Sequence, residues 1–149
     1  MLRQLLIFLH LSSIIVWVGG MFFAYFCLRP AAAKRLEPPQ RLPLWVATFD
    51  LFFRYTAVAV VLALATGLTM FFQVGFKLAP MGWHIMLTLG LIMSAVFGHV
   101  YFALYPRLRS QCEASAWPAA AAVLNSIRRM VGLNLILAVC TVAAAISSR

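Results

Sequence analysis

The sequence contains three histidines, His10, His84 and His99, and each falls in or beside a long apolar stretch. An ionisable side chain inside the hydrocarbon of a membrane is costly, so a histidine there is by default a functional hypothesis. A neutral imidazole can ligate haem iron or copper ion, and it can also form a hydrogen bond between helices. Met21 adds a thioether, which is a soft ligand that suits cuprous ion. These four residues are the candidate metal ligands.

The composition indicates a membrane protein. Of the 149 residues, 64% are hydrophobic and only 10% are charged, and the mean hydropathy is +0.97. These values exclude a soluble enzyme domain. The formal net charge of +9 is expected to orient the chain in a bilayer rather than to bind nucleic acid. Cys27, Cys112 and Cys140 are isolated, so neither a disulfide framework nor a zinc site is indicated.

Four apolar stretches are long enough to cross a bilayer. The expected spans are residues 4–28, 53–75, 83–105 and 130–147, joined by loops over residues 29–52 and 106–129. Both loops are rich in arginine, so the positive-inside rule places them in the cytoplasm and both termini in the periplasm. Pro106 is expected to end the third span. We therefore expect one all-α domain over residues 1–149, an integral membrane up-down four-helix bundle in a bacterial inner membrane.

The helical period places the candidate ligands on inward faces. The residues that share the His10 face of the first span are Ser13, Trp17, Met21, Ala24 and Leu28. At about 1.5 Å per residue, His10 and His84 lie at an outer level of the bundle, and Met21 and His99 at an inner one. Spans one and three are diagonal in an up-down bundle, at roughly 11 to 14 Å, which suits a porphyrin iron held between two histidines.

We therefore expect a b-type haem between the first and third membrane helices, with His10 and His84 as its axial ligands. Gly20 would make room for the flat ring, Trp17 would cover it, and Arg54 would balance a propionate. A membrane electron-transfer role would follow.

Each of these residues also has a simpler interpretation, which stays open at this point. Arg54 lies four residues after Asp50, a spacing typical of an ion pair on one helix. His84 could be an interfacial side chain without a ligand. His99 could replace His84 on the iron, or it could form a hydrogen bond to Asn134 of the last span.

Two other functions remain open. In the first, His10, Met21, His84 and His99 form successive transient sites for cuprous ion, in a copper uptake or resistance protein. In the second, the chain is a cofactor-free accessory subunit of a membrane complex. A redox or copper-carrying partner, a homo-oligomer or a larger complex would fit these functions. The sequence shows no nucleophile, paired carboxylates or phosphate loop, so the enzymatic activity that stays open is a redox role.

Several motifs resemble the copper-resistance D (CopD-like) membrane family, in its short four-helix form. They are the run H-L-S-S-I-I-V-W-V-G-G at residues 10–20, the stretch G-W-H-I-M at residues 82–86, and F-G-H-V-Y-F at residues 97–102 followed by P-R-L-R. The resemblance implies an inner-membrane protein linked to copper uptake or resistance.

A second, partial resemblance is to the HemJ-type membrane protoporphyrinogen oxidases. It rests on His10, Trp17, Gly20 and His84, and it implies that the first-helix histidine binds haem. Met86 stands where that family has a lysine, so the resemblance does not extend to porphyrinogen oxidation.

Overall fold

The computed structural model describes residues 1–147, which form helices and no strand. The first span runs through α1 (Leu2–Phe22), the π-helix η1 (Phe23–Leu28) and α2 (Arg29–Arg35), and the second is the single helix α3 (Pro38–Val74). The third runs through α4 (Met81–His99), the π-helix η2 (Val100–Leu104) and α5 (Tyr105–Glu113), and the fourth is α6 (Trp117–Ile146). All four are long and apolar enough to cross a membrane. The expected all-α membrane fold with four spans is confirmed.

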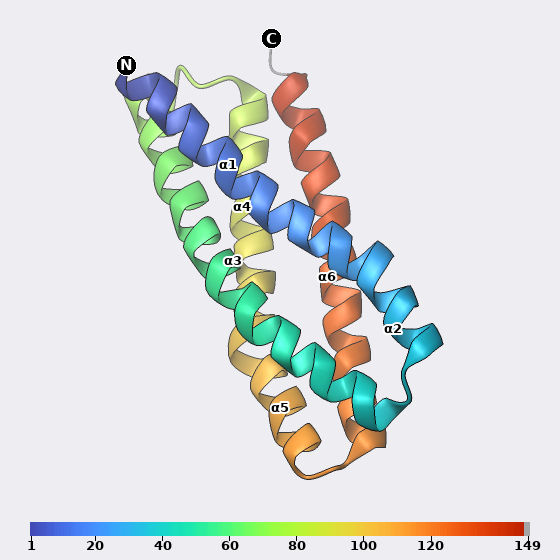
Figure 1. Cartoon of the computed structure of the whole chain (residues 1–149). Coiled ribbons are helices and arrows are strands. Elements are labelled where there is room, and N and C mark those ends of the chain that lie inside the picture. The colour runs from blue at the N-terminus through green and yellow to red at the C-terminus, as the bar shows by residue number, and fades with distance from the viewer. Residues whose placement is uncertain (148–149) are drawn as a thin grey trace.

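The spans run alternately up and down (Figure 1). α1 packs mainly along α3, while α4 and α5 pack along α6, and α1 and α4 are not close neighbours. The N-terminus and the end of α6 lie at the same end of the bundle. This is the up-down bundle expected from the sequence, with the first and third spans diagonal to each other. The side of the membrane that holds both termini stays a prediction.

The helices extend through most of the segments expected to be loops. Between residues 29 and 52 the helices are broken only at Leu36 and Glu37, and between residues 106 and 129 only at Ala114 to Ala116. Proline does not prevent this in α3 and α6, because Pro38, Pro39 and Pro118 stand in a first turn, where the missing N–H would have no helical partner. Pro43 lies inside α3, which continues past it. The membrane limits within these long helices stay predictions.

The helix of the third span does not end at Pro106 but continues to Glu113, and the position at which this span leaves the membrane stays a prediction. A proline inside a helix clashes with the carbonyl four residues earlier, which here belongs to Phe102. Phe102 lies in η2, and the matching carbonyl for Pro30 belongs to Phe26 in η1. Each π-helix thus lies directly before a proline, and its wider turn accommodates the ring while the helix continues.

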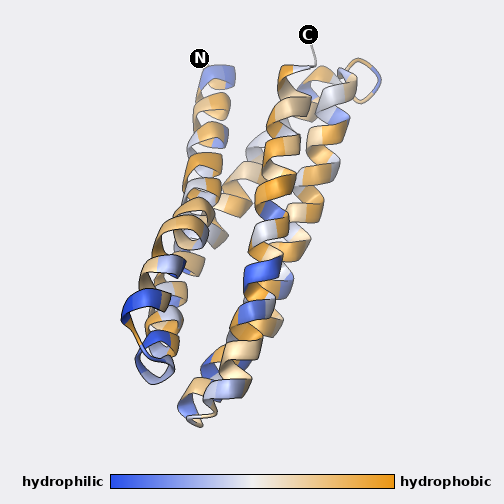
Figure 2. Cartoon of the chain, turned by 90° about the vertical axis from the view of Figure 1, so that its right-hand side faces the viewer, coloured by the Kyte–Doolittle hydropathy of each residue, from blue (hydrophilic) through white to orange (hydrophobic). Residues whose placement is uncertain are grey.

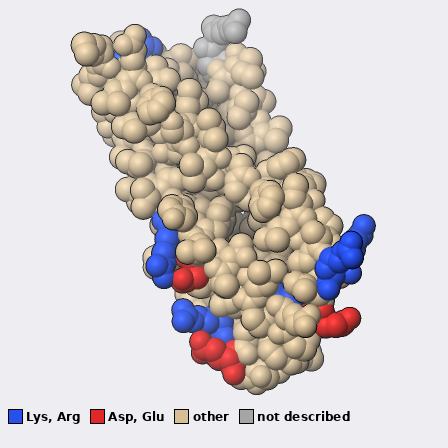
Figure 3. Space-filling model, in the orientation of Figure 1, with Lys and Arg blue, Asp and Glu red and all other residues tan. Residues whose placement is uncertain are grey.

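Aromatic side chains fill the centre of the bundle. Phe53 contacts the rings of Phe97, Tyr101 and Tyr105 at centroid distances of 5.2 to 5.9 Å. Trp17 of α1 reaches across to Phe97, at 6.2 Å. Apolar residues make up most of the helices (Figure 2), and many large apolar side chains are exposed, as expected for surfaces that contact lipid. Charged side chains gather toward the end of the bundle opposite the termini (Figure 3).

Candidate functional site

His10 of α1 faces α3 rather than the centre of the bundle. Its Nδ1 lies 2.9 Å from the carbonyl oxygen of Ala63 and 3.1 Å from the hydroxyl oxygen of Thr66. Gly67 completes the recess, because a Cβ atom added there would lie 3.0 Å from the imidazole Cε1. The half-buried ring therefore occupies a recess formed by about one turn of the neighbouring helix α3.

The contact with Ala63 determines the tautomer of His10. A carbonyl oxygen only accepts, so Nδ1 carries the proton and donates it. The Thr66 hydroxyl donates its own proton to the carbonyl of Leu62, at 2.6 Å. Nε2 then has a free lone pair, and no hydrogen bond to it occurs within residues 1–147. Histidines that ligate metals commonly donate their other ring N–H to a backbone carbonyl in this way.

The other two histidines lie in different surroundings. The His84 ring packs edge-on against Phe71 and Phe76, at centroid distances of 5.1 and 4.7 Å. His99, at the other end of α4, is exposed on the helix surface. The expected alternative of a bond from His99 to Asn134 was wrong, because the Asn134 amide donates to the carbonyl of Met93 instead.

The structure does not gather the histidines into one centre. No ring contact or hydrogen bond joins any two of them in the described part of the chain. Nor do residues 1–147 contain a group of three or more His, Cys, Asp or Glu that could hold a metal ion.

The space between α1 and α4 is filled by side chains. The ring of Phe52 from α3 lies where a Cβ atom of Gly20 would be. Trp17 and Met21, at 2% and 3% exposure, are packed into the interior. The cavity that remains at this level measures about 20 Å³, close to the volume that one water molecule needs. No cavity of porphyrin size remains at this level, so the packing gives no support to the expected haem or to electron transfer through it.

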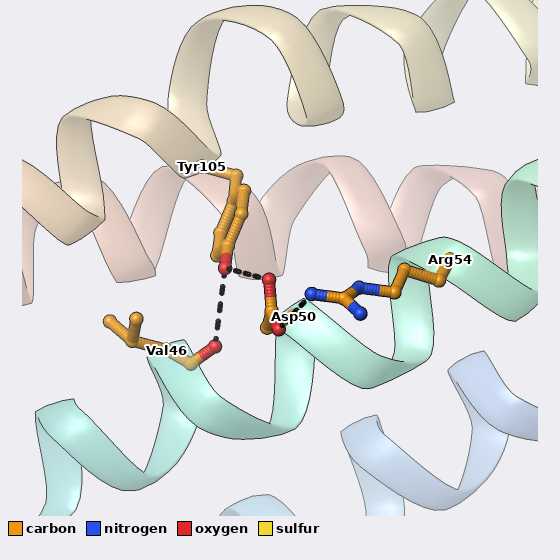
Figure 4. A network of polar contacts seen from close by, with 4 residues as sticks. All are labelled: Val46, Asp50, Arg54 and Tyr105. Carbon is orange, nitrogen blue, oxygen red and sulfur yellow. Dashed lines mark hydrogen bonds and ion pairs between the residues drawn. The ribbon is translucent and has the colours of Figure 1, made fainter.

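Arg54 takes part in a polar network at the charged end of the bundle (Figure 4). Its guanidinium forms an ion pair with Asp50 at 2.8 Å, which confirms the simpler interpretation of this residue. The Tyr105 hydroxyl, from α5, approaches the other oxygen of Asp50 at 3.4 Å and the carbonyl of Val46 at 3.5 Å. The network ties α5 to α3.

The small central cavity has an unusual lining for the interior of a membrane bundle. Among its lining residues are Trp17, Met21, Met130 and Asn134, and we call it the thioether cavity. Asn134 is 3% exposed, and its amide nitrogen donates to the carbonyl of Met93 at 3.1 Å. Its Oδ1 is buried and has no hydrogen-bond partner within residues 1–147.

The sequence analysis missed several of these residues. Met130 and Asn134 were not placed at a site, and Thr66 and Gly67 were not recognised as the partners of His10. A polar residue at position 134 in an apolar span was the one available signal. The partners of His10 had no such signal, because threonine and glycine are common in membrane helices.

Comparison with known proteins identifies a family. The model of the CopD family, described as copper resistance protein D, matches residues 46–147. No curated protein and no solved structure matches the chain. The resemblance to the HemJ-type oxidases gains no support from these comparisons. The matched residues include Met130 and Asn134, whereas His10 and Met21 precede them. Because the match covers well over half of the sequence, the chain belongs to the copper resistance protein D family.

Proposed function

We propose that this protein handles copper in the membrane and binds cuprous ion, as its cargo, in the thioether cavity. Its family description refers to copper resistance, and two of the side chains that line the cavity carry thioethers, which cuprous ion prefers. Uptake of copper and resistance to copper would both use such a site.

The observation that carries this proposal is the combination of donors in the cavity. Met21 and Met130 contribute thioethers, which select cuprous ion over harder cations. The Trp17 ring offers a π face that attracts a cation. The unpartnered Oδ1 of Asn134 is the only strong acceptor there that lacks a partner in the described residues. A buried water makes about three hydrogen bonds, so a cavity with one such acceptor suits a soft cation better than a water.

His10 provides a second position for the ion. Its Nε2 lone pair is available because Nδ1 donates to Ala63. Met21 follows His10 by about 16 Å along the helix axis, so the two cannot hold the same ion. Separate sites with few ligands each suit an ion that is passed along rather than permanently held. His84 lies near the N-terminal end of α4, where it would make a further transient contact with the cuprous ion.

The proposed setting is a bacterial inner membrane with both termini in the periplasm. The charged side chains lie toward the opposite end of the bundle (Figure 3), and basic segments favour the cytoplasm. A copper-carrying partner would then deliver or remove copper at the periplasmic end of the bundle, where α1 begins and α6 ends.

The test is the affinity of detergent-purified protein for cuprous ion, measured without oxygen by competition with a chromophoric chelator. Met21→Leu and Met130→Leu keep the side-chain volume nearly constant, so the packing should persist. Each should weaken cuprous binding by at least tenfold. Met86→Leu is the matched control, since Met86 is half-buried in α4 but does not line the thioether cavity.

Equal affinities for all three variants and the parent would contradict the proposal. So would a parent protein that binds less than one equivalent of cuprous ion. A visible Soret band in the purified protein would instead restore the haem hypothesis.

A further inference from the structure

A second and larger cavity lies toward the charged end of the bundle. It measures about 210 Å³ and is bounded by η1 and α2, the first turns of α3, and the middle of α6. Arg29, Arg41 and Arg128 line it, one from each of these three regions. No histidine, methionine or cysteine lines this cavity, so its chemistry differs from that of the thioether cavity.

The three arginines differ from the other basic residues. Within residues 1–147, every other lysine and arginine is exposed, whereas Arg29, Arg41 and Arg128 are each half-buried. A long basic side chain normally extends its charge into water or the headgroup region. Three that converge on one partly enclosed space repel each other unless an anion lies between them.

The protein does not supply that anion from the residues that the structure describes. Asp50 pairs with Arg54, Glu113 pairs with Arg109, and Glu37 is exposed at the link between α2 and α3 and forms no ion pair within residues 1–147. No ion pair reaches any of the three cavity arginines within residues 1–147. The guanidinium of Arg29 lies over the ring of Tyr25, 5.7 Å from its centroid, which positions it without neutralising it.

The rest of the wall is largely apolar. Trp45, Phe49, Leu124 and Val131 contribute to it. A small inorganic anion would leave this surface bare, whereas an amphiphile would cover it with hydrocarbon. The charged side chains in this part of the bundle, below an uncharged section, indicate the headgroup level of a membrane (Figure 3).

We propose that this cavity binds an anionic phospholipid. The arginine forks would hold the phosphodiester oxygens through charge-assisted hydrogen bonds, and one acyl chain would lie along the apolar wall. Basic pockets between membrane helices bind anionic headgroups by this chemistry. The bound lipid would connect α2, α3 and α6, each of which contributes one arginine to the cavity.

The test uses the full chain, purified and delipidated in an uncharged detergent, and native mass spectrometry to count bound lipid. The probes are phosphatidylglycerol, zwitterionic phosphatidylethanolamine, and glycerol phosphate as the headgroup without acyl chains. We expect phosphatidylglycerol to bind at least tenfold more tightly than either of the other two. Arg128→Gln should weaken that binding about tenfold, the loss expected for one charge-assisted contact.

Arg129→Gln is the matched control, because Arg129 is the next residue on α6, carries the same charge and is exposed. It should change phosphatidylglycerol binding by less than twofold. Arg41→Gln repeats the test on α3, and a thermal melt without lipid shows whether each variant is folded.

Equal losses in Arg128→Gln and Arg129→Gln would overturn the proposal, since binding would then follow net charge alone. Equal binding of phosphatidylethanolamine would overturn it too, and glycerol phosphate as tight as the lipid would show a free-phosphate site instead. The outcome is separate from the copper proposal, because Arg128→Gln leaves every residue of the thioether cavity unchanged.

Discussion

Two adjacent glycines in α1 allow a stringent test of how α1 and α3 pack. A Cβ atom at Gly20 would collide with the ring of Phe52, whereas one at Gly19 would have nothing within 4 Å. Gly20→Ala should therefore destabilise the bundle, and Gly19→Ala should not. Under the haem hypothesis Gly20 would instead serve a porphyrin, and its substitution would act through the cofactor.

The magnitude follows from two opposing effects. Replacing glycine by alanine inside a helix favours the helix by up to about 1 kcal/mol in water, and this gain applies to both variants. Overpacking a filled interior costs roughly 1 to 3 kcal/mol, and this cost applies only at Gly20. The difference in unfolding free energy between the two variants should therefore be about 1 to 3 kcal/mol, with Gly20→Ala the less stable.

The assay is reversible unfolding in mixed detergent micelles, followed by circular dichroism and tryptophan fluorescence. A second substitution makes it specific, because Phe52→Leu removes the ring that the new methyl group meets. The double variant should recover most of the difference, which a double-mutant cycle measures directly. Equal stabilities for Gly19→Ala and Gly20→Ala, or no recovery in the double variant, would refute the packing described for α1 and α3.

Three further predictions test other parts of the molecule. His10→Asn keeps an amide donor near Nδ1 but removes Nε2, so it should weaken cuprous binding while costing less stability than His10→Ala; equal losses of stability would argue against the bond to Ala63. Asp50→Asn should lower the free energy of unfolding by less than about 1 kcal/mol, as expected for a partly exposed ion pair. A larger loss on chemical unfolding would mean that the network in Figure 4 contributes more to stability than an exposed ion pair does. Alkaline phosphatase fused to the C-terminus should be active in bacteria, whereas activity only in a cytoplasmic reporter would reverse the expected orientation.

The inward face of the first span illustrates what periodicity can predict. Ser13, Trp17 and Met21 share the His10 face of a 3.6-residue helix, and all three are buried. Burial follows from spacing here because each helix must turn its least lipid-compatible stripe toward its neighbours. The ion pair of Asp50 with Arg54 was predictable for the same reason, since residues four apart on a helix are always adjacent.

The partners of the buried polar groups were not predictable. His10 contacts Ala63 and Thr66, more than fifty residues away in sequence, and Asn134 contacts a carbonyl of α4. Which groups meet depends on the rotation and crossing of packed helices, and apolar helices can pack in several ways with similar energy. The haem hypothesis gains no support from the structure at this step, because it assumed that two inward histidines on diagonal helices would face each other.

Hydrophobic length and the distribution of charge act locally along the chain, so the amino-acid sequence was enough to predict a membrane setting, four spans and their alternating direction. Only the packing of the helices fixed the recess around His10 and the lining of both cavities. These features arise where side chains from different helices compete for the same space, and that competition has no signature in any single segment.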